Sequence, residues 1–245
     1  MRKYAYWIFL FLLIAGLVAS PTPKTARTRI ADGFDQPVGK PDAKDYYMSR
    51  GFRAKYHMGE DWNGIAGGNS DLGDPVYSVA HGIVVLARDM RMAWGNLVIV
   101  RHTFIEDNQR KVVDSVYAHL EQIMVKEGQQ IVRGQQVGTI GNNRGMYRAH
   151  LHFELRKNIY IGYNQRGFAG DLSNYYIPGA FINPRRKLSG GGRSGVVAVD
   201  TFNLPSNSIS STSTKNESVA SSKPSSSEAK PSSKSFRVNR FEDPL

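Results

Sequence analysis

Six short runs of apolar and β-branched residues constrain the fold of this 245-residue chain more than any other feature. Polar residues alternate with apolar ones inside the runs, and glycines, an Asp-Pro pair and an Asn-Asn pair separate them. A two-residue period is typical of strands that bury one face, and short strands joined by turns form antiparallel sheets. We therefore predict a mainly β domain built from antiparallel β-sheets. The runs are Val76–Val79, Ile83–Ala87, Leu97–Val100, Val112–Tyr117, Gln136–Ile140 and Leu151–Leu155.

The last of these runs and the residue just before it carry two histidines on one face. His150 and His152 are two residues apart, so in a strand both imidazoles project to the same side, while Leu151 and Phe153 anchor the other side in a core. Two rigidly held imidazoles are what a zinc site or a hydrolytic site requires. The His-x-His triplet alone is a weak signal, because short patterns occur often without a metal.

His57 and Asp61 form a second candidate pair. Their i, i+4 spacing places both side chains on one face of a helix or a strand. Gly59 and the following Trp62-Asn63-Gly64 segment disfavour a helix, so we expect a strand or a turn at a strand edge. A catalytic zinc ion takes three protein ligands and one water. His57, Asp61 and one histidine of the later pair supply that count, although surface partners in a polar loop would have the same spacing.

His119 is the third candidate, in Tyr117-Ala118-His119-Leu120 at the end of a β-branched run, and we expect it near a strand terminus. Four of the six histidines thus fall in three places. His81 precedes Gly82 at an expected turn, and we interpret it as a surface residue. His102 follows a strand, and we interpret it as a structural residue or as one that supports the site from behind.

The order of these motifs is more informative than any one of them. A His-x-x-x-Asp motif, a Tyr-Ala-His-Leu segment and a His-Leu-His triplet followed by an aromatic residue and an acid resemble the lysostaphin-type (LytM-like) zinc endopeptidases that cut peptidoglycan. The resemblance covers about residues 46–187. It implies that His57, Asp61 and His152 are the zinc ligands and that His119 and His150 are catalytic histidines that do not bind the metal. It also implies strands of lipoyl-like barrel-sandwich character that form an open groove with zinc on its floor.

Several further features surround these motifs. Family members often place a tyrosine upstream of the first ligand, and Tyr46, Tyr47 and Tyr56 are the candidates here. Arg144 and Arg148 precede the histidine pair and could meet carboxylates of a stem peptide, or they could be solvated loop charges. Residues 66–72 make a longer link after Asp61 than the compact members have; they could shape the groove, but we favour a surface loop.

The charge balance is basic, with 32 Lys and Arg against 21 Asp and Glu for a net charge of +11. We expect no nucleic acid partner, because the charges are scattered and no helix-turn-helix, finger spacing or basic amphipathic helix occurs. After export, such a charge would favour anionic wall polymers or membrane surfaces. The chain has no cysteine, so a zinc site must use His and Asp.

The N-terminus has the pattern of a targeting segment. Arg2 and Lys3 precede an apolar run at 4–19 that is short for a transmembrane helix. We expect residues 1–20 to be a signal peptide or an uncleaved signal anchor in the membrane. The protein is then exported to the periplasm, the cell envelope or the medium.

Composition divides the rest of the chain. Residues 21–45 are expected to form a linker, 46–187 the zinc metallopeptidase domain, and 188–245 a disordered tail rich in Ser, Lys and Pro.

The predicted function is hydrolysis of peptide cross-links or bridges of peptidoglycan by a metal-activated water and two histidines. One alternative is a non-catalytic peptidoglycan-binding or regulatory domain of the same fold that controls another wall hydrolase; its degenerate members lose ligands that this chain retains. The other is a carrier module over Val125 through Gly141, which would need an exposed lysine in a hairpin and would leave the histidines without a purpose.

Overall fold

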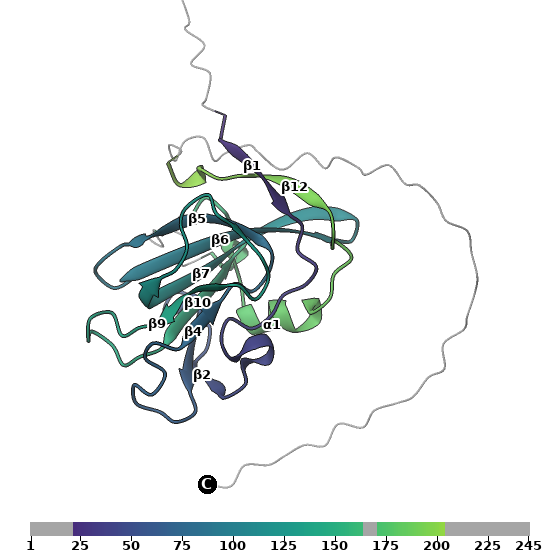
Figure 1. Cartoon of the computed structure of the whole chain (residues 1–245). Coiled ribbons are helices and arrows are strands. Elements are labelled where there is room, and N and C mark those ends of the chain that lie inside the picture. Colours follow the sequence, from purple (N-terminus) through teal and green to yellow (C-terminus); the bar gives the residue numbers. More distant parts are fainter. Residues whose placement is uncertain (1–21, 164–170, 204–245) are drawn as a thin grey trace, which may run out of the picture.

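The computed structural model describes residues 22–163 and 171–203, and within them the chain is built almost entirely of antiparallel strands (Figure 1). The predicted targeting segment and most of the predicted tail lie outside these residues. The strands are β1 Thr25–Arg29, β2 Tyr46–Arg50, β3 Glu60–Gly64, β4 Pro75–Tyr77, β5 Gly82–Asp89, β6 Asn96–Glu106, β7 Gln109–Ile123, β8 Gln130–Ile131, β9 Gln136–Ile140, β10 Leu151–Arg156, β11 Tyr175–Tyr176 and β12 Ser194–Ala198.

Helical elements are short. They are α1 Pro178–Ile182 and the single turns η1 Gly39–Ala43, η2 Leu172–Asn174, η3 Asn183–Arg185 and η4 Thr201–Asn203. Among the described residues, no helix has the length and apolar character needed to cross a membrane. The prediction of a mainly β, antiparallel fold is confirmed, and each of the six predicted runs overlaps a strand.

The main sheet follows the order β2-β3-β10-β7-β6-β5-β8, with β11 paired to β10 and β9 paired to both β4 and β7. Strand β10 lies between β3 and β7, and this position brings distant parts of the sequence together. Leu151 and Phe153 lie in the main core as predicted, although the residues that alternate with them are buried as well. The ring of Phe153 contacts Tyr117 of β7 at a centroid distance of 5.4 Å.

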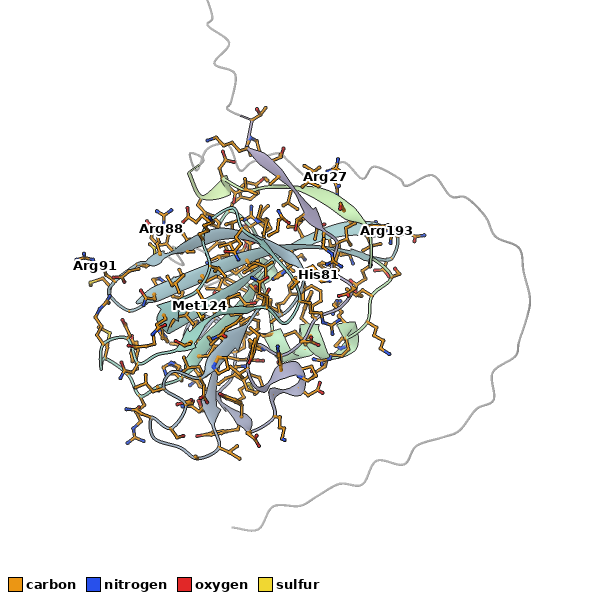
Figure 2. All side chains as sticks on the ribbon, in the orientation of Figure 1. Arg27, His81, Arg88, Arg91, Met124 and Arg193 are labelled. Atoms are coloured by element: carbon orange, nitrogen blue, oxygen red, sulfur yellow. The ribbon has the colours of Figure 1, made fainter. Side chains whose placement is uncertain are left out.

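The folded region extends beyond both predicted boundaries. Residues 25–29 of the predicted linker pair as β1 with β12, which belongs to the predicted tail (Figure 1). Phe34 is fully buried and packs edge-on against Phe104 and Phe181, at 5.6 and 5.1 Å. Apolar residues such as Phe34 are spaced widely between polar ones, so this part of the sequence shows no strand-like period. Arg27 and Arg193, labelled in Figure 2, mark the surface of the β1–β12 pair.

A buried ion pair joins the C-terminal part of this extension to the main sheet. The Arg101 guanidinium donates two hydrogen bonds of 2.7 Å to the carboxylate of Asp114, and both side chains are almost completely buried. Arg101 also donates to the carbonyl of Ala198 at 2.6 Å, to the carbonyl of Ile159 at 2.9 Å and to the hydroxyl of Thr201 at 3.0 Å. The predicted tail boundary at 188 therefore cuts through a packed part of the domain.

The two histidines outside the motifs are both buried. His102 is fully buried, and its Nδ1–H donates to the carbonyl of His81 at 2.9 Å, so the prediction of a structural residue is confirmed. The prediction of a surface position for His81, labelled in Figure 2, is wrong. His81 accepts a hydrogen bond from the backbone N–H of Arg133 at 3.0 Å. The cause is Gly82, where a Cβ would lie 2.5 Å from the carbonyl oxygen of Arg101, so that only glycine allows this segment to pack so closely.

Candidate metal centre

Three of the predicted site residues meet at the junction of β3 and β10. His57 lies just before β3, Asp61 lies in β3, and His152 of β10 is the register partner of Asp61. A close backbone approach makes this possible, because a Cβ at Gly59 would lie 2.3 Å from the carbonyl oxygen of Phe153. The segment that carries the His57 and Asp61 side chains can therefore lie directly against β10.

The three side chains converge on one point. His57 Nε2 is 2.9 Å from Asp61 Oδ1 and 3.0 Å from His152 Nδ1, and His152 Nδ1 is 2.9 Å from the same oxygen. All three residues are buried. Together they form a group that could hold a metal ion. Ligand atoms in tetrahedral zinc sites lie about 3.3 Å apart when the bonds are about 2.0 Å, so the triangle has nearly the required size.

Each histidine has one ring nitrogen that faces away from the common point, and the hydrogen bond of that nitrogen determines whether the other nitrogen carries a proton or a lone pair. His57 Nδ1 is 2.9 Å from the carbonyl of Gly51, and His152 Nε2 is 2.9 Å from Glu154 Oε1. A carbonyl and a carboxylate accept hydrogen bonds, so these two nitrogens carry the protons. In the neutral imidazoles, His57 Nε2 and His152 Nδ1 then present lone pairs to the common point beside Asp61. Three acceptors that face each other need a cation between them.

The carboxylates around His152 favour positive charge at this point. Burial alone would lower the pKa of His152, but Asp61 and Glu154 raise it to about 9. Burial would raise the pKa of Asp61, but the ring nitrogens of His152 and His57 hold it below its usual range. A divalent metal would replace the proton that this environment attracts. The donor set, two imidazoles and one carboxylate, suits zinc.

Glu154 keeps the proton of His152 on Nε2, so that Nδ1 faces the common point as an acceptor. No sequence pattern had assigned this role to Glu154. It is fully buried in β10 and holds His152 Nε2, while its second oxygen accepts from Arg156 Nε at 2.7 Å. Carboxylates behind metal-binding histidines orient the ring and raise its basicity. The signal was present, because Glu154 and His152 are two residues apart and share a face of the strand.

His119 lies beside this centre in an unusual conformation. It is part of β7 rather than at a strand terminus as predicted, and its φ of 62° lies in the left-handed region. The register of β7 with β6 shifts between Tyr117 and Leu120, as it does at a β-bulge, and the register of β7 with β9 shifts just beyond, between Leu120 and Ile123. The irregularity turns the imidazole to within 5.6 Å of the His152 ring, centroid to centroid. Strained backbone of this kind concentrates at functional sites.

His119 is neutral near pH 7. Burial, together with the charge that His152 and His150 carry when protonated, lowers the pKa of His119 to about 3. Its Nδ1 lies 3.3 Å from the carbonyl of Trp94, which can only accept, so Nδ1 carries the proton. The Nε2 atom is therefore an unprotonated base.

His150 is also held through its Nδ1 atom. Its Nδ1 donates to the carbonyl of Arg148 at 2.8 Å, and its Nε2 lies 3.9 Å from Asp61 Oδ1. The rings of His150 and His119 are 4.9 Å apart. His150 thus faces the centre without belonging to the group of three donors.

The tyrosine next to these histidines is not one of the three upstream candidates. Tyr147 packs against His119 at 4.8 Å and against His150 at 5.8 Å. Tyr46 donates its hydroxyl to Asp74 at 2.6 Å, and Tyr47 and Tyr56 are exposed. No sequence pattern marked Tyr147, because its contact depends on how the loop before β10 folds back.

The two arginines before the histidine pair are both exposed. Arg144 forms an ion pair of 2.6 Å with Asp89, and Arg148 provides the carbonyl that holds His150.

Comparisons with known proteins agree with this geometry. The model of Peptidase family M23 matches residues 56–164. The lipoprotein NlpD of Yersinia enterocolitica is 33% identical over 84 residues, which are 34% of this chain and 78% of the relative. The chain belongs to peptidase family M23. The predicted resemblance to lysostaphin-type enzymes is thereby confirmed at the level of the family.

Two longer relatives differ in their names. The peptidoglycan DD-endopeptidase ShyA of Vibrio cholerae serotype O1 is 33% identical over 135 residues, 54% of this chain and 26% of the relative. The murein hydrolase activator NlpD of Salmonella typhimurium is 32% identical over 103 residues, 40% of this chain and 25% of the relative. This M23 chain thus spans about a quarter of the length of either relative. Among solved structures, a zinc-containing peptidase from Vibrio cholerae is similar at 29% identity and a TM-score of 0.40, over 51% of this chain and 37% of that one.

Proposed function

We propose that this M23 chain is a zinc-dependent endopeptidase that hydrolyses peptide cross-links or bridges of bacterial peptidoglycan. One observation carries the proposal: His57 Nε2, Asp61 Oδ1 and His152 Nδ1 meet within 3.0 Å of one another, with their protons on the far side. In this proposal these three atoms hold the metal, and His119 and His150 are the catalytic histidines.

The proposed reaction follows from which ring nitrogens of the histidines carry protons. Bound at this point, zinc would lower the pKa of a water molecule to about 7 and polarise a substrate carbonyl. The Nε2 of His119 is an unprotonated base beside the His152 ring, and His150 Nε2 lies 3.9 Å from Asp61 Oδ1, so in this proposal either imidazole accepts a proton during attack on the peptide bond. The resulting N–H can donate a hydrogen bond to the developing oxyanion or return its proton to the amine that leaves.

The substrate class and the place of action are part of the proposal. A relative named peptidoglycan DD-endopeptidase supports a wall peptide as substrate. The net charge of +11 suits a surface rich in anionic polymers. The apolar run at 4–19 after Arg2 and Lys3 supports export to the cell envelope, with either cleavage or retention as an anchor.

A regulatory role is the second candidate, because one relative is named a murein hydrolase activator. An activator that does no chemistry has no requirement for three buried donors that face a common point. The complete donor set therefore favours the enzyme.

The deciding experiment is digestion of purified peptidoglycan by the full chain loaded with zinc. We expect soluble muropeptides with newly freed amino groups, which mass spectrometry identifies together with the bond cut. A chelator and the Asp61→Ala variant should both abolish release. If the zinc-loaded protein releases nothing but stimulates a second wall hydrolase, the regulatory candidate is correct.

A further inference from the structure

Ala149, the residue before His150, is held by the side-chain amides of two asparagines. Asn69 Oδ1 accepts a hydrogen bond from the backbone N–H of Ala149 at 2.8 Å. Asn63 Nδ2 donates to the backbone carbonyl of Ala149 at 2.9 Å. Together the two asparagines occupy both backbone polar groups of one residue, in the way that a neighbouring strand would. We call this pair the amide clamp.

The clamp holds the segment just before β10, where the chain is not part of the regular hydrogen-bonded ladder. Strand β10 begins at Leu151, so Ala149 and His150 precede its regular hydrogen-bonded ladder. His150 retains one isolated bridge to Gly141, with an N to O distance of 3.3 Å that is long for a backbone hydrogen bond. Ala149 is fully buried and next to this weakly held residue, so whatever fixes Ala149 also fixes the start of the His150 side chain.

The clamp is itself tied to the strand that carries Asp61. Asn63 is a residue of β3, and its Oδ1 accepts a hydrogen bond from the hydroxyl of Ser49. Asn69 lies in the loop after β3, and Asp71 anchors that loop by accepting the backbone N–H of Gly64 at 3.0 Å. Asp71 is almost completely buried. The loop at 66–72, which we interpreted from the sequence as a plain surface loop, is thus connected to the site.

We infer that Asn63 and Asn69 are positioning residues that set His150 Nε2 against the metal-facing oxygen of Asp61. The inference rests on the proposed function of His150. The distance between these two atoms is 3.9 Å. On one side of His150 the Leu151–Trp62 pair of the ladder fixes the chain to β3, and on the other side the clamp fixes Ala149, so the position of His150 relative to Asp61 depends on the clamp as well as on the ladder. A displacement of about 1 Å in a reacting group can cost on the order of a hundredfold in rate.

The same substitution at the two positions provides a matched test. Asn69→Asp retains an acceptor oxygen for the N–H of Ala149, whereas Asn63→Asp loses the donor to its carbonyl. Both add one negative charge beside Ala149. We expect kcat to stay within about twofold in Asn69→Asp and to fall about tenfold in Asn63→Asp, with KM and zinc affinity unchanged in both. Equal losses in the two variants would show that charge, not the hydrogen bond, is responsible.

Asn69→Ala should lower kcat about fivefold, and Ser70→Ala in the same loop, whose side chain makes no hydrogen bond to Ala149, should have no effect. Thermal melts of each variant distinguish a local displacement from loss of folding. In a His150→Ala background, Asn69→Ala should cause no further loss, because a positioning residue has nothing left to position. A full additional loss in the double variant would overturn the inference.

A measurement without substrate separates this inference from the proposed function. In the zinc-loaded full chain, Asn69→Ala should speed hydrogen exchange at the N–H of Ala149 and should shift and broaden the imidazole resonances of His150. The resonances of His102, which is buried in the core, should not change. If the wild-type protein proves inactive, these spectra still test the clamp, and unchanged His150 resonances in both Asn69→Ala and Asn63→Asp would refute it.

Discussion

Two buried charged clusters lie on the same sheet, and their hydrogen bonding is opposite in kind. At the Arg101–Asp114 pair, every guanidinium nitrogen faces an oxygen at 2.6–3.0 Å. At His57, Asp61 and His152, three atoms meet within 3.0 Å, and all three are acceptors when the imidazoles are neutral, because the ring protons then lie on the far nitrogens. The first cluster is complete without a ligand, and the second is complete only when a proton or a metal cation lies at its centre.

The difference shows how a buried polar cluster can be assigned a role. Burial and charge are shared by both clusters, so neither property identifies the site. The decisive property is whether donors and acceptors balance inside the protein. A balanced cluster fixes the fold, and a cluster with an excess of acceptors binds a cation. This contrast predicts that substitutions in the His57, Asp61 and His152 cluster reduce metal binding. Substitutions in the Arg101–Asp114 pair should instead reduce the free energy of unfolding.

The largest effect should come from removing a donor in the unbalanced cluster. In His152→Ala or Asp61→Ala, zinc affinity should fall by more than the roughly 10- to 100-fold that loss of a supporting residue costs, and turnover should reach background. Metal content after dialysis, measured beside turnover, checks this. Arg101→Met is the control and should retain its zinc. Zinc loss in the control would remove the distinction between the clusters.

Substitutions in the Arg101–Asp114 cluster should lower the free energy of unfolding. Asp114→Ala leaves the Arg101 charge buried without its partner, which costs about 3–5 kcal/mol of unfolding free energy. Urea unfolding measures the loss, and zinc content per folded molecule should stay at the wild-type value. The double variant Arg101→Met, Asp114→Leu should be less destabilised than Asp114→Ala, because no charge remains buried. A loss below about 1 kcal/mol in Asp114→Ala would show that water reaches the pair.

The two histidines beside the metal centre should separate chemistry from binding. His119→Asn and His150→Ala leave the three donors intact, so zinc should remain bound while kcat falls about a hundredfold. Asparagine is preferred at position 119 because it tolerates the φ of 62°. Comparison of His150→Ala with His152→Ala is the sharpest form of this test, since the residues are two apart. Equal zinc loss in both would mean that their roles are misassigned.

The smallest effect concerns pH and a histidine outside the site. Burial lowers the pKa of His102 to about 4. In the unfolded chain the pKa is about 6.5, so below that pH the unfolded state binds a proton that the folded state excludes. The contribution of His102 to stability is therefore complete above pH 6.5 and is lost as the pH falls toward 4. We expect a loss of about 2 kcal/mol at pH 5, measured by urea unfolding. His102→Gln should flatten this dependence.

Local patterns were sufficient to predict much of the fold. The alternation in Leu151–Leu155 gave the correct inward residues of β10, and the i, i+2 spacing placed His150 and His152 on one face. Both inferences depend only on the geometry of a strand, which neighbours in sequence determine. The resemblance then selected the His57, Asp61 and His152 group that the structure brings together.

Features set by distant contacts could not be predicted in this way. The bulge at His119 depends on how β7 shifts against two neighbouring strands, and the burial of His81 depends on the close approach at Gly82. The pairing of β1 with β12 joins segments about 170 residues apart, of which we predicted the first to be a linker and the second to be part of a disordered tail. The contacts of Asn69 and Tyr147 arise from loops that fold back over β10, and no local period marks them.

The pairing of β1 with β12 also determines how the domain can be tethered. Thr25, near the start of the described region, is the register partner of Ala198, near its end. Any attachment, whether it precedes β1 or follows β12, therefore pulls on the body at nearly the same spot. Arg101 links that spot to Asp114, and His119 is five residues further along β7, roughly 16 Å away. A tether before β1 and a tether after β12 would therefore hold the His57, Asp61 and His152 group at nearly the same distance from the point of attachment.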